Sequence, residues 1–168
     1  MKNVPKAAIV IFITSVILMN FVLIHSCNQV KTYRNYEDDS LAIAQVLQNN
    51  LGWAKTKDFE LFLSGISADS IFRSITPYKR VVTYPEGIEQ NKAIWLDDRF
   101  QAISHELIDL KVQISESGNM AWFYCIVNDY NTWEGKPVNW ENVRRTGVLE
   151  KRNNEWKIVQ QHLSFATN

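Results

Sequence analysis

The stretch RTGVLEKRNNEWKIVQQHLS, residues 145–164, decides the fold, because two runs of alternating apolar and polar residues flank a pair of asparagines. Asn153 and Asn154 suit a two-residue hairpin loop, since asparagine tolerates the positive φ that such a loop needs. In that register Arg152 faces Glu155, and the pairing continues residue by residue away from the turn. The stretch therefore predicts an antiparallel hairpin at the end of the chain.

The hairpin register brings an arginine opposite a histidine, which predicts an anion site. Arg145 faces His162 at the end farther from the turn, where the shared face changes from apolar to polar. Opposed cationic groups are unfavourable by up to about 1 kcal/mol, so either His162 is neutral or an anion lies between the two side chains. We consider a carboxylate ligand held by both residues. The alternative is that His162 bonds a backbone carbonyl while Arg145 pairs with an acid elsewhere.

Working outward toward the amino terminus, the pattern predicts helices before strands. A first amphipathic helix has an apolar stripe that begins at Ile43, Asp58 opens a second, short helix, and Asn91 caps a third whose stripe reaches Phe100 and Ile103. The expected elements after these are short strands within 70–90, strands over 108–114 and 120–130, a loop over 131–140, and strands over 141–151 and 155–165. Helices first and an antiparallel meander last indicate the α+β class, with helices packed on one side of a curved sheet.

The chain has 168 residues with 18 basic and 18 acidic side chains, and 46% of its residues are apolar. This composition excludes a disordered or low-complexity chain. The first 26 residues contain two lysines and no acid, so the rest of the chain is slightly acidic and we do not expect nucleic acid as a partner. The sequence contains no metal-ligand spacing or cofactor fingerprint, and we expect neither a metal nor a cofactor.

The amino terminus has the pattern of an export signal. Lys2 and Lys6 precede an apolar run over 7–24, which has the form of a signal peptide and nearly the length of a membrane-spanning helix. Cys27 ends this run, and the segment 23–27 resembles the lipobox of bacterial lipoproteins. We expect a signal peptide or membrane anchor over 1–26, lipidation of Cys27, a tether over 27–37 and one domain over 38–168. The domain is then exported and held at a membrane of the cell envelope; an uncleaved anchor and soluble release are the alternatives to lipidation.

The hairpin at the end of the chain also resembles a known superfamily. Trp156, Val159, His162 and Ser164 follow the spacing that ends SnoaL-like domains and the association domains of calcium/calmodulin-dependent kinases. Over about residues 38–166 the chain resembles the nuclear transport factor two-like superfamily, also called SnoaL-like or ketosteroid-isomerase-like. The resemblance implies a cone-shaped fold, with about three amino-terminal helices on a curved, mostly antiparallel sheet, and a homodimer formed across the open face of that sheet. Of the aspartate and histidine that its polyketide cyclases use, His162 alone has a counterpart here.

Four aromatic side chains complete the set of candidate site residues. Beside the arginine and histidine, a ligand cavity could be lined by Trp53, Trp95, Trp122 and Tyr124, although large aromatics also fill cores. Trp122 and Tyr124 lie in a run that is apolar on both faces, so we expect one face to meet the helices and the other a second copy of the protein. We favour a non-catalytic protein that binds a small carboxylate or aromatic molecule. The alternatives are an enzyme of isomerase or cyclase type and a homo-oligomerisation module.

Overall fold

The computed structural model describes residues 36–78 and 80–166, which contain three helices and a seven-stranded sheet. The helices are α2 (Tyr36–Thr56), α3 (Phe59–Ser64) and α4 (Glu86–Trp95). The strands are β1 (Arg73–Ile75), β2 (Val81–Thr83), β3 (Phe100–Ile114), β4 (Met120–Trp133), β5 (Lys136–Pro137), β6 (Trp140–Arg152) and β7 (Glu155–Ser164). Within the described residues, no helix is long and apolar enough to cross a membrane. The expected signal segment 1–26, Cys27 and the tether up to residue 35 lie outside them, and α2 already includes residues 36 and 37.

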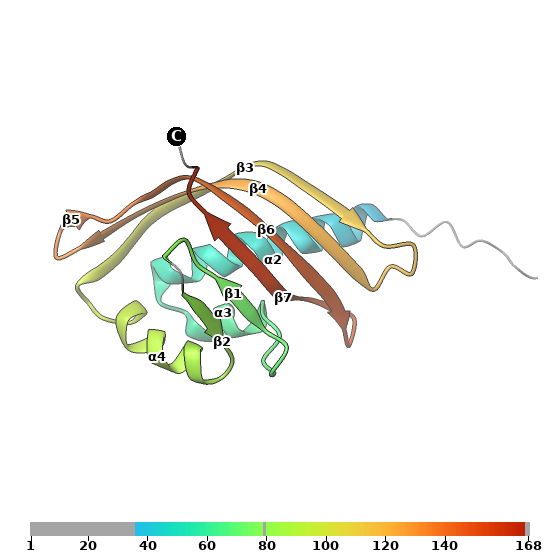
Figure 1. Cartoon of the computed structure of the whole chain (residues 1–168), viewed down its shortest axis with the longest axis horizontal. Helices are drawn as coiled ribbons and strands as arrows, with labels where there is room; N and C mark the ends of the chain where they lie inside the picture. Colours follow the sequence, from blue (N-terminus) through green and yellow to red (C-terminus); the bar gives the residue numbers. More distant parts are fainter. Residues whose placement is uncertain (1–35, 79, 167–168) are drawn as a thin grey trace, which may run out of the picture. The chain divides into compact units, whose positions relative to one another are not determined.

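The sheet has the strand order β2-β1-β7-β6-β4-β3, with β5 paired to β4. β1 and β7 run parallel, and the other pairs of described strands are antiparallel. Figure 1 shows the sheet curving over α2, with α3 and α4 on the same, concave side. The α+β prediction, with helices on a curved and mostly antiparallel sheet, is confirmed. Residues 131–140, expected to be a loop, instead contain the end of β4 and the short strand β5.

The first two helices form where the sequence predicts them. The apolar stripe of α2 buries Ile43, Leu47 and Trp53 in the core beneath the sheet. Asp58 caps α3, since its carboxylate accepts a hydrogen bond from the backbone N–H of Leu61 at 3.0 Å. Burial of this stripe holds α2 beneath the sheet, so that its inward side chains reach the interior of the cone.

The predicted bounds of the third helix are wrong. α4 begins at Glu86 rather than at Asn91, and Phe100 and Ile103 belong to β3. Asn91 is buried inside the helix, where its side-chain amide donates to the carbonyl of Gly87 at 2.5 Å instead of capping a helix end. The helical spacing that the sequence shows up to Phe100 and Ile103 is therefore a coincidence, because it runs from α4 across a turn into β3.

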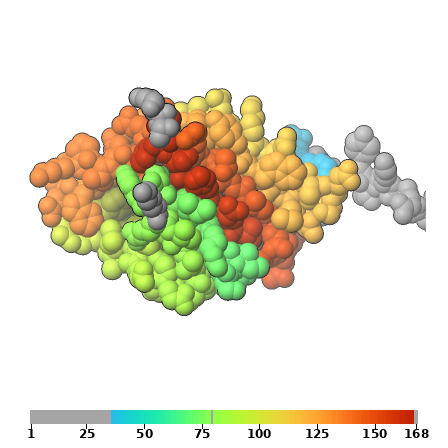
Figure 2. All heavy atoms as spheres, in the orientation of Figure 1, coloured from blue at the N-terminus to red at the C-terminus, as the bar shows by residue number. Residues whose placement is uncertain are grey.

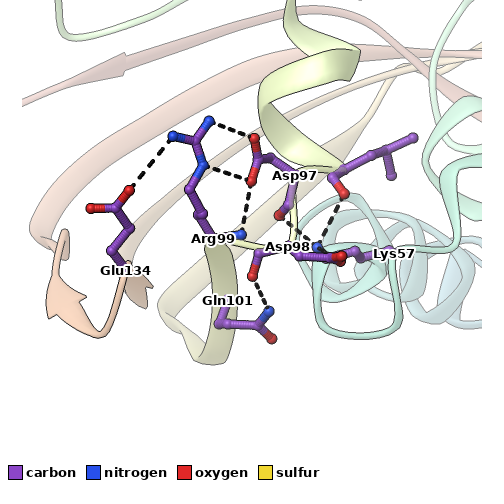
Figure 3. Close-up of polar contacts among 7 residues, drawn as sticks. Lys57, Asp97, Asp98, Arg99, Gln101 and Glu134 are labelled. Carbon is purple, nitrogen blue, oxygen red and sulfur yellow. Dashed lines mark hydrogen bonds and ion pairs between the residues drawn. The ribbon is translucent and has the colours of Figure 1, made fainter.

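Charged side chains hold the turn between α4 and β3, as Figure 3 shows. Lys57 Nζ donates to the backbone carbonyls of Leu96 at 3.1 Å and Asp97 at 2.6 Å, which satisfies carbonyl groups that the end of α4 leaves open. Arg99 lies between Asp97 and Glu134, with N–O distances of 2.8 and 3.5 Å. These contacts join the residue after α2, the turn and the β4–β5 connection, and they fix the position of the turn between α4 and β3.

The β6–β7 hairpin forms, but its predicted register holds along part of its length. Asn153 and Asn154 have φ values of 50° and 67°, as the two-residue turn requires. From this turn the predicted pairs are confirmed up to the pair formed by Leu149 and Ile158. The next residue of β7, Val159, is the extra residue of a β-bulge, and beyond it every residue of β6 pairs with a residue one position later in β7 than predicted.

The bulge overturns the predicted pair of Arg145 and His162. Beyond it, Arg145 faces Leu163 and His162 faces Thr146. Because side chains alternate along a strand, the extra residue turns His162 outward and brings Gln161 into the interior. The expected anion clamp of arginine and histidine is therefore wrong.

Candidate functional site

A cavity of about 160 Å³ lies inside the cone, among residues of the helices and of the concave face of the sheet. Aromatic side chains form much of its apolar wall, among them Trp53, Phe62, Trp95 and Trp140. The polar side chains of the wall are Asn50, Ser74, Thr76, Asp129, Arg145 and Gln161. An apolar wall with a few placed polar groups is typical of a small-molecule site.

Arg145 projects from β6 into this cavity and is fully buried. Its Nη2 donates to Asn50 Oδ1 at 2.7 Å, and its Nη2 and Nε donate to Gln161 Oε1 at 2.8 and 3.1 Å. A longer bond of 3.4 Å joins Nη1 to the carbonyl of Leu47. Burial lowers the pKa of Arg145 to about 10, so the guanidinium is still a cation at neutral pH.

The acceptors around Arg145 are all neutral. Among residues 36–78 and 80–166, no carboxylate forms an ion pair with it. The ring of Phe123 lies 5.4 Å from the guanidinium carbon and contributes a cation–π contact. The interior therefore holds a buried positive charge that meets amide and carbonyl oxygens and a ring, but no directly bonded counter-ion from the described chain.

Gln161 reaches Arg145 as a consequence of the bulge at Val159. Its Oε1 accepts both bonds from the guanidinium, and its Nε2 donates to Ser74 Oγ at 3.0 Å. The amide thus links β6 to β7 and β1 and holds the arginine in one orientation. The predicted register has His162 facing inward, so it implies that the neighbouring Gln161 faces outward; strict alternation contains no signal for a bulge.

Asn50 contributes an unsatisfied donor to the wall. Its side chain is buried, and although Oδ1 accepts from Arg145, Nδ2 has no hydrogen-bond partner among the residues that the structure describes. A buried polar atom left without a partner costs about 1–3 kcal/mol. Asn50 Nδ2 and the guanidinium therefore offer two neighbouring donors to an acceptor inside the cavity.

Asp129 adds a titratable group to the same wall. Burial raises its pKa, while a hydrogen bond from Asn131 and the charges of His105 and Arg145 act in the opposite direction. His105 stands opposite Asp129 on β3 and shares a hydrogen bond of 2.8 Å with Gln48 Oε1 through Nε2. The cavity thus contains one cation and one acid that keeps its proton to higher pH than usual.

The predicted site residues divide between this cavity and the outer surface. Arg145, Trp53 and Trp95 line the cavity together, and the two tryptophan rings lie 5.9 Å apart. His162 does not join them, because it is exposed on the convex face of the sheet.

Trp122 and Tyr124 also lie on the convex face, outside the cavity. They are 49% and 41% exposed and form part of a shallow groove with Lys111 and Gln160. Trp122 Nε1 donates to Gln113 Oε1 at 2.7 Å. The prediction that these two aromatics line the cone pocket is therefore wrong, and the inward side chain between them is that of Phe123.

Sequence analysis missed the polar groups that accompany Arg145. Asn50, Asp129 and Gln161 come from α2, β4 and β7, and no local motif connects them. A signal existed for Asp129, since it continues the inward alternation of Cys125 and Val127 along β4. Asn50 joins the site through packing of α2 beneath the sheet, and Gln161 joins it through the bulge at Val159 in the neighbouring strand.

A cone of helices and curved sheet around an interior cavity defines the class of protein. Residues 43–168 match the family model described as the SnoaL-like domain, and the chain belongs to this family. The resemblance to SnoaL-like and NTF2-like proteins is thus confirmed. No curated protein matches the chain.

Solved structures share the fold. An NTF2-like protein from Cytophaga hutchinsonii is 15% identical, with a TM-score of 0.62 over 79% of this chain and 99% of that chain. An NTF2-like protein of unknown function from Prochlorococcus marinus is 18% identical, with a TM-score of 0.61 over 77% of this chain and 94% of that chain. The association domain of CaMKII from C. elegans is 17% identical, with a TM-score of 0.58 over 77% of this chain and 97% of that chain. At these identities the likeness shows the fold alone.

Proposed function

We propose that this SnoaL-like domain is a non-catalytic binding protein whose cavity holds a small molecule through a carboxylate. The observation that carries the proposal is the fully buried Arg145, whose hydrogen bonds all go to neutral acceptors. A buried charge is costly unless it is paired. A carboxylate in the cavity would supply the missing negative charge and accept from Arg145 and from Asn50 Nδ2.

The apolar wall sets the rest of the ligand. Trp53, Phe62 and Trp95 form a cluster of rings with centroid separations of 5.2, 5.4 and 5.9 Å, and all three line the cavity. A ring or short alkyl group beside the carboxylate would pack against them. Benzoate therefore represents the ligand class in its simplest form, and benzamide is the matched neutral control.

The experiment measures thermal unfolding with each of these two compounds. Benzoate should raise the melting temperature of the wild-type protein and benzamide should not, because the charge provides most of the binding. Arg145→Met, which replaces a buried charge by an apolar side chain of similar length, should abolish the benzoate effect.

Asn50→Asp provides a second test that does not remove the arginine. Arg145 Nη2 donates to Asn50 Oδ1 at 2.7 Å, and a carboxylate at this position would accept the same hydrogen bond. Its negative charge would neutralise the buried guanidinium without a ligand. The free variant should melt higher than wild type by about 3 °C or more and lose its response to benzoate. An equal benzoate response in the wild type and in Asn50→Asp would contradict the anion site.

The proposal includes a homodimer formed through the convex face of the sheet. Met120, Trp122 and Tyr124 expose apolar surface there, with exposed fractions of 44%, 49% and 41%. An apolar patch of this kind is typical of a protein interface. Association domains occur among the solved structures that share the fold, which supports an oligomer.

The proposal also places the domain at the cell envelope. The apolar run over 7–24 and Cys27 support export followed by lipid attachment. Cys27→Ser should release the protein from the membrane fraction if the lipid is the anchor. Unchanged fractionation would show that the apolar run itself holds the protein.

A further inference from the structure

We infer that Tyr78, Trp140 and Phe165 form an outer subsite that binds the apolar end of the ligand held by Arg145. The ligand class is then an amphipathic carboxylate that carries an aromatic or alkyl tail. This inference rests on the proposed function, because it uses the same carboxylate anchor.

The three rings come from three separate segments of the chain. Tyr78 lies in the turn between β1 and β2, Trp140 is the first residue of β6, and Phe165 follows β7. The ring centroids of Tyr78 are 6.1 Å from Trp140 and 5.8 Å from Phe165, and those of Trp140 and Phe165 are 6.5 Å apart. All three pairs meet edge to face, at 62°, 64° and 80°. In Figure 2 the segments that carry them gather on one face of the domain, near the end of the chain.

Trp140 connects this cluster to the cavity. It is half-buried and belongs to the cavity wall, as does Thr76, the half-buried residue just before the turn that carries Tyr78. Trp140 thus touches both the cavity and the outer rings, so under this inference the ligand leaves the cavity between the β1–β2 turn and the start of β6. Tyr78 is 64% exposed and Phe165 36% exposed, so their rings extend the apolar wall outward into solvent.

The size of the cavity indicates that a ligand would continue to this cluster. A buried cavity of about 150 Å³ accommodates a single benzene ring. The cavity here, about 160 Å³, would therefore be nearly filled by one ring or its equivalent in alkyl carbons. A longer carboxylate anchored on Arg145 would extend beyond the cavity, and an exit past Trp140 would bring its tail to the outer rings.

The aromatic cluster is not needed to hold the end of the chain in place. Arg144 Nη2 already donates to the backbone carbonyl of Phe165 at 2.7 Å, and β7 is paired up to Ser164. Tyr78 in turn lies on an exposed turn, where an aromatic side chain gains little from burial. The rings are thus available for contact with a ligand tail.

The experiment compares benzoate, 3-phenylpropionate and 5-phenylpentanoate by isothermal titration calorimetry. The longest compound should bind the wild-type protein at least about tenfold more tightly than benzoate, since its ring would be buried among the outer rings. Tyr78→Ala should lose most of this gain while binding benzoate within about twofold of wild type. Tyr36 is also an exposed tyrosine but lies on α2, so Tyr36→Ala should keep the full increase in affinity.

The outcomes separate this inference from the proposed function. Suppose that benzoate binds and that its binding requires Arg145. If 5-phenylpentanoate then binds no more tightly than benzoate, or if Tyr78→Ala keeps the increase in affinity, the outer subsite is wrong and the carboxylate site at Arg145 stands. If none of the three carboxylates binds, or if Arg145→Met binds them as well as wild type does, both proposals are wrong. Trp140→Phe gives a second measure, because a smaller ring next to Tyr78 and Phe165 should reduce the increase in affinity from benzoate to 5-phenylpentanoate. Trp140 is half-buried, so this substitution does not alter a fully buried side chain.

Discussion

The two faces of the sheet depart from the usual burial pattern in opposite ways. On the concave face β6 buries the charged Arg145, whereas on the convex face β4 exposes Trp122 and Tyr124. Charged side chains are seldom fully buried without a counter-ion, and clustered exposed aromatics mark contact surfaces. Each face therefore carries groups that the described chain leaves incomplete: a cation on one side and an apolar surface on the other. Under our proposals, the same two strands serve a small anion inside and a second copy of the protein outside.

The largest expected effect comes from filling the concave face at Gly147. A Cβ added there would lie 2.5 Å from the carbonyl oxygen of Gln160 and 2.6 Å from Cε1 of Phe123. Because the oxygen belongs to the backbone of the neighbouring strand, Gly147→Ala should lower the free energy of unfolding by about 3 kcal/mol. Urea denaturation measures this loss.

Thr146→Ala is the matched control on the convex face. Thr146 is the neighbouring residue on β6 and is exposed, so its truncation should change the free energy of unfolding by less than about 0.5 kcal/mol. Equal losses in the two variants would show that the faces do not differ in packing.

The sequence predicted the parts of the fold that follow local rules. The Asp58 cap, the stripe of α2 and the turn at Asn153 and Asn154 depend on residues close in the chain, and each forms as expected. The bulge at Val159 has no such local rule, because Ile158 and Val159 are both apolar and both buried. One extra residue then exchanged the faces of all the residues that follow it.

The same limit applies to β3 and to the site. Asp109 has a φ of 53° at a second bulge, so Leu107 and Leu110 both face inward and Ile108 faces outward, whereas strict alternation would place Ile108 and Leu110 on the same face. In the cavity, Arg145 was predicted as a site residue, but its partner Asn50 lies 95 residues earlier on α2, and its partner Gln161 faces inward because of the bulge in β7. Helix packing and strand bulges decide these partners, and periodicity describes neither.

A second prediction tests the convex face. If this face forms the dimer, Trp122→Lys should weaken self-association by about 30-fold, corresponding to the roughly 2 kcal/mol typical of an interface tryptophan. Ile94→Lys changes an apolar side chain that is 48% exposed on α4, away from the sheet, and should leave association unchanged. Sedimentation velocity over a range of protein concentrations measures both. A wild-type protein that is monomeric throughout, or equal weakening in the two variants, would contradict the dimer.

The smallest expected effect is a pH dependence on the concave face. Burial raises the pKa of Asp129, so the folded protein keeps this proton at pH values where the unfolded chain has lost it. A pKa raised by folding gives stability that is complete below the unfolded pKa and is lost as the pH rises through the folded one. The stability of wild type relative to Asp129→Asn should therefore decline as the pH increases from about 4 toward neutrality. Urea denaturation of both proteins across this range measures the difference, and a constant difference would contradict the raised pKa.

Ligand binding distinguishes this titration from a change in packing. A deprotonated Asp129 adds a negative charge to the wall that it shares with Arg145, so the affinity of wild type for benzoate should fall as the pH rises through the pKa of Asp129. In Asp129→Asn the affinity should stay level over the same range, because no acid remains there to repel the carboxylate. His105 lies opposite Asp129 on β3, and burial lowers the pKa of its ring. When His105 loses its proton the neighbourhood of the cavity loses a positive charge, which would also weaken benzoate binding. A parallel decline in both proteins, measured by calorimetry, would therefore assign the effect to His105 and remove Asp129 as its cause.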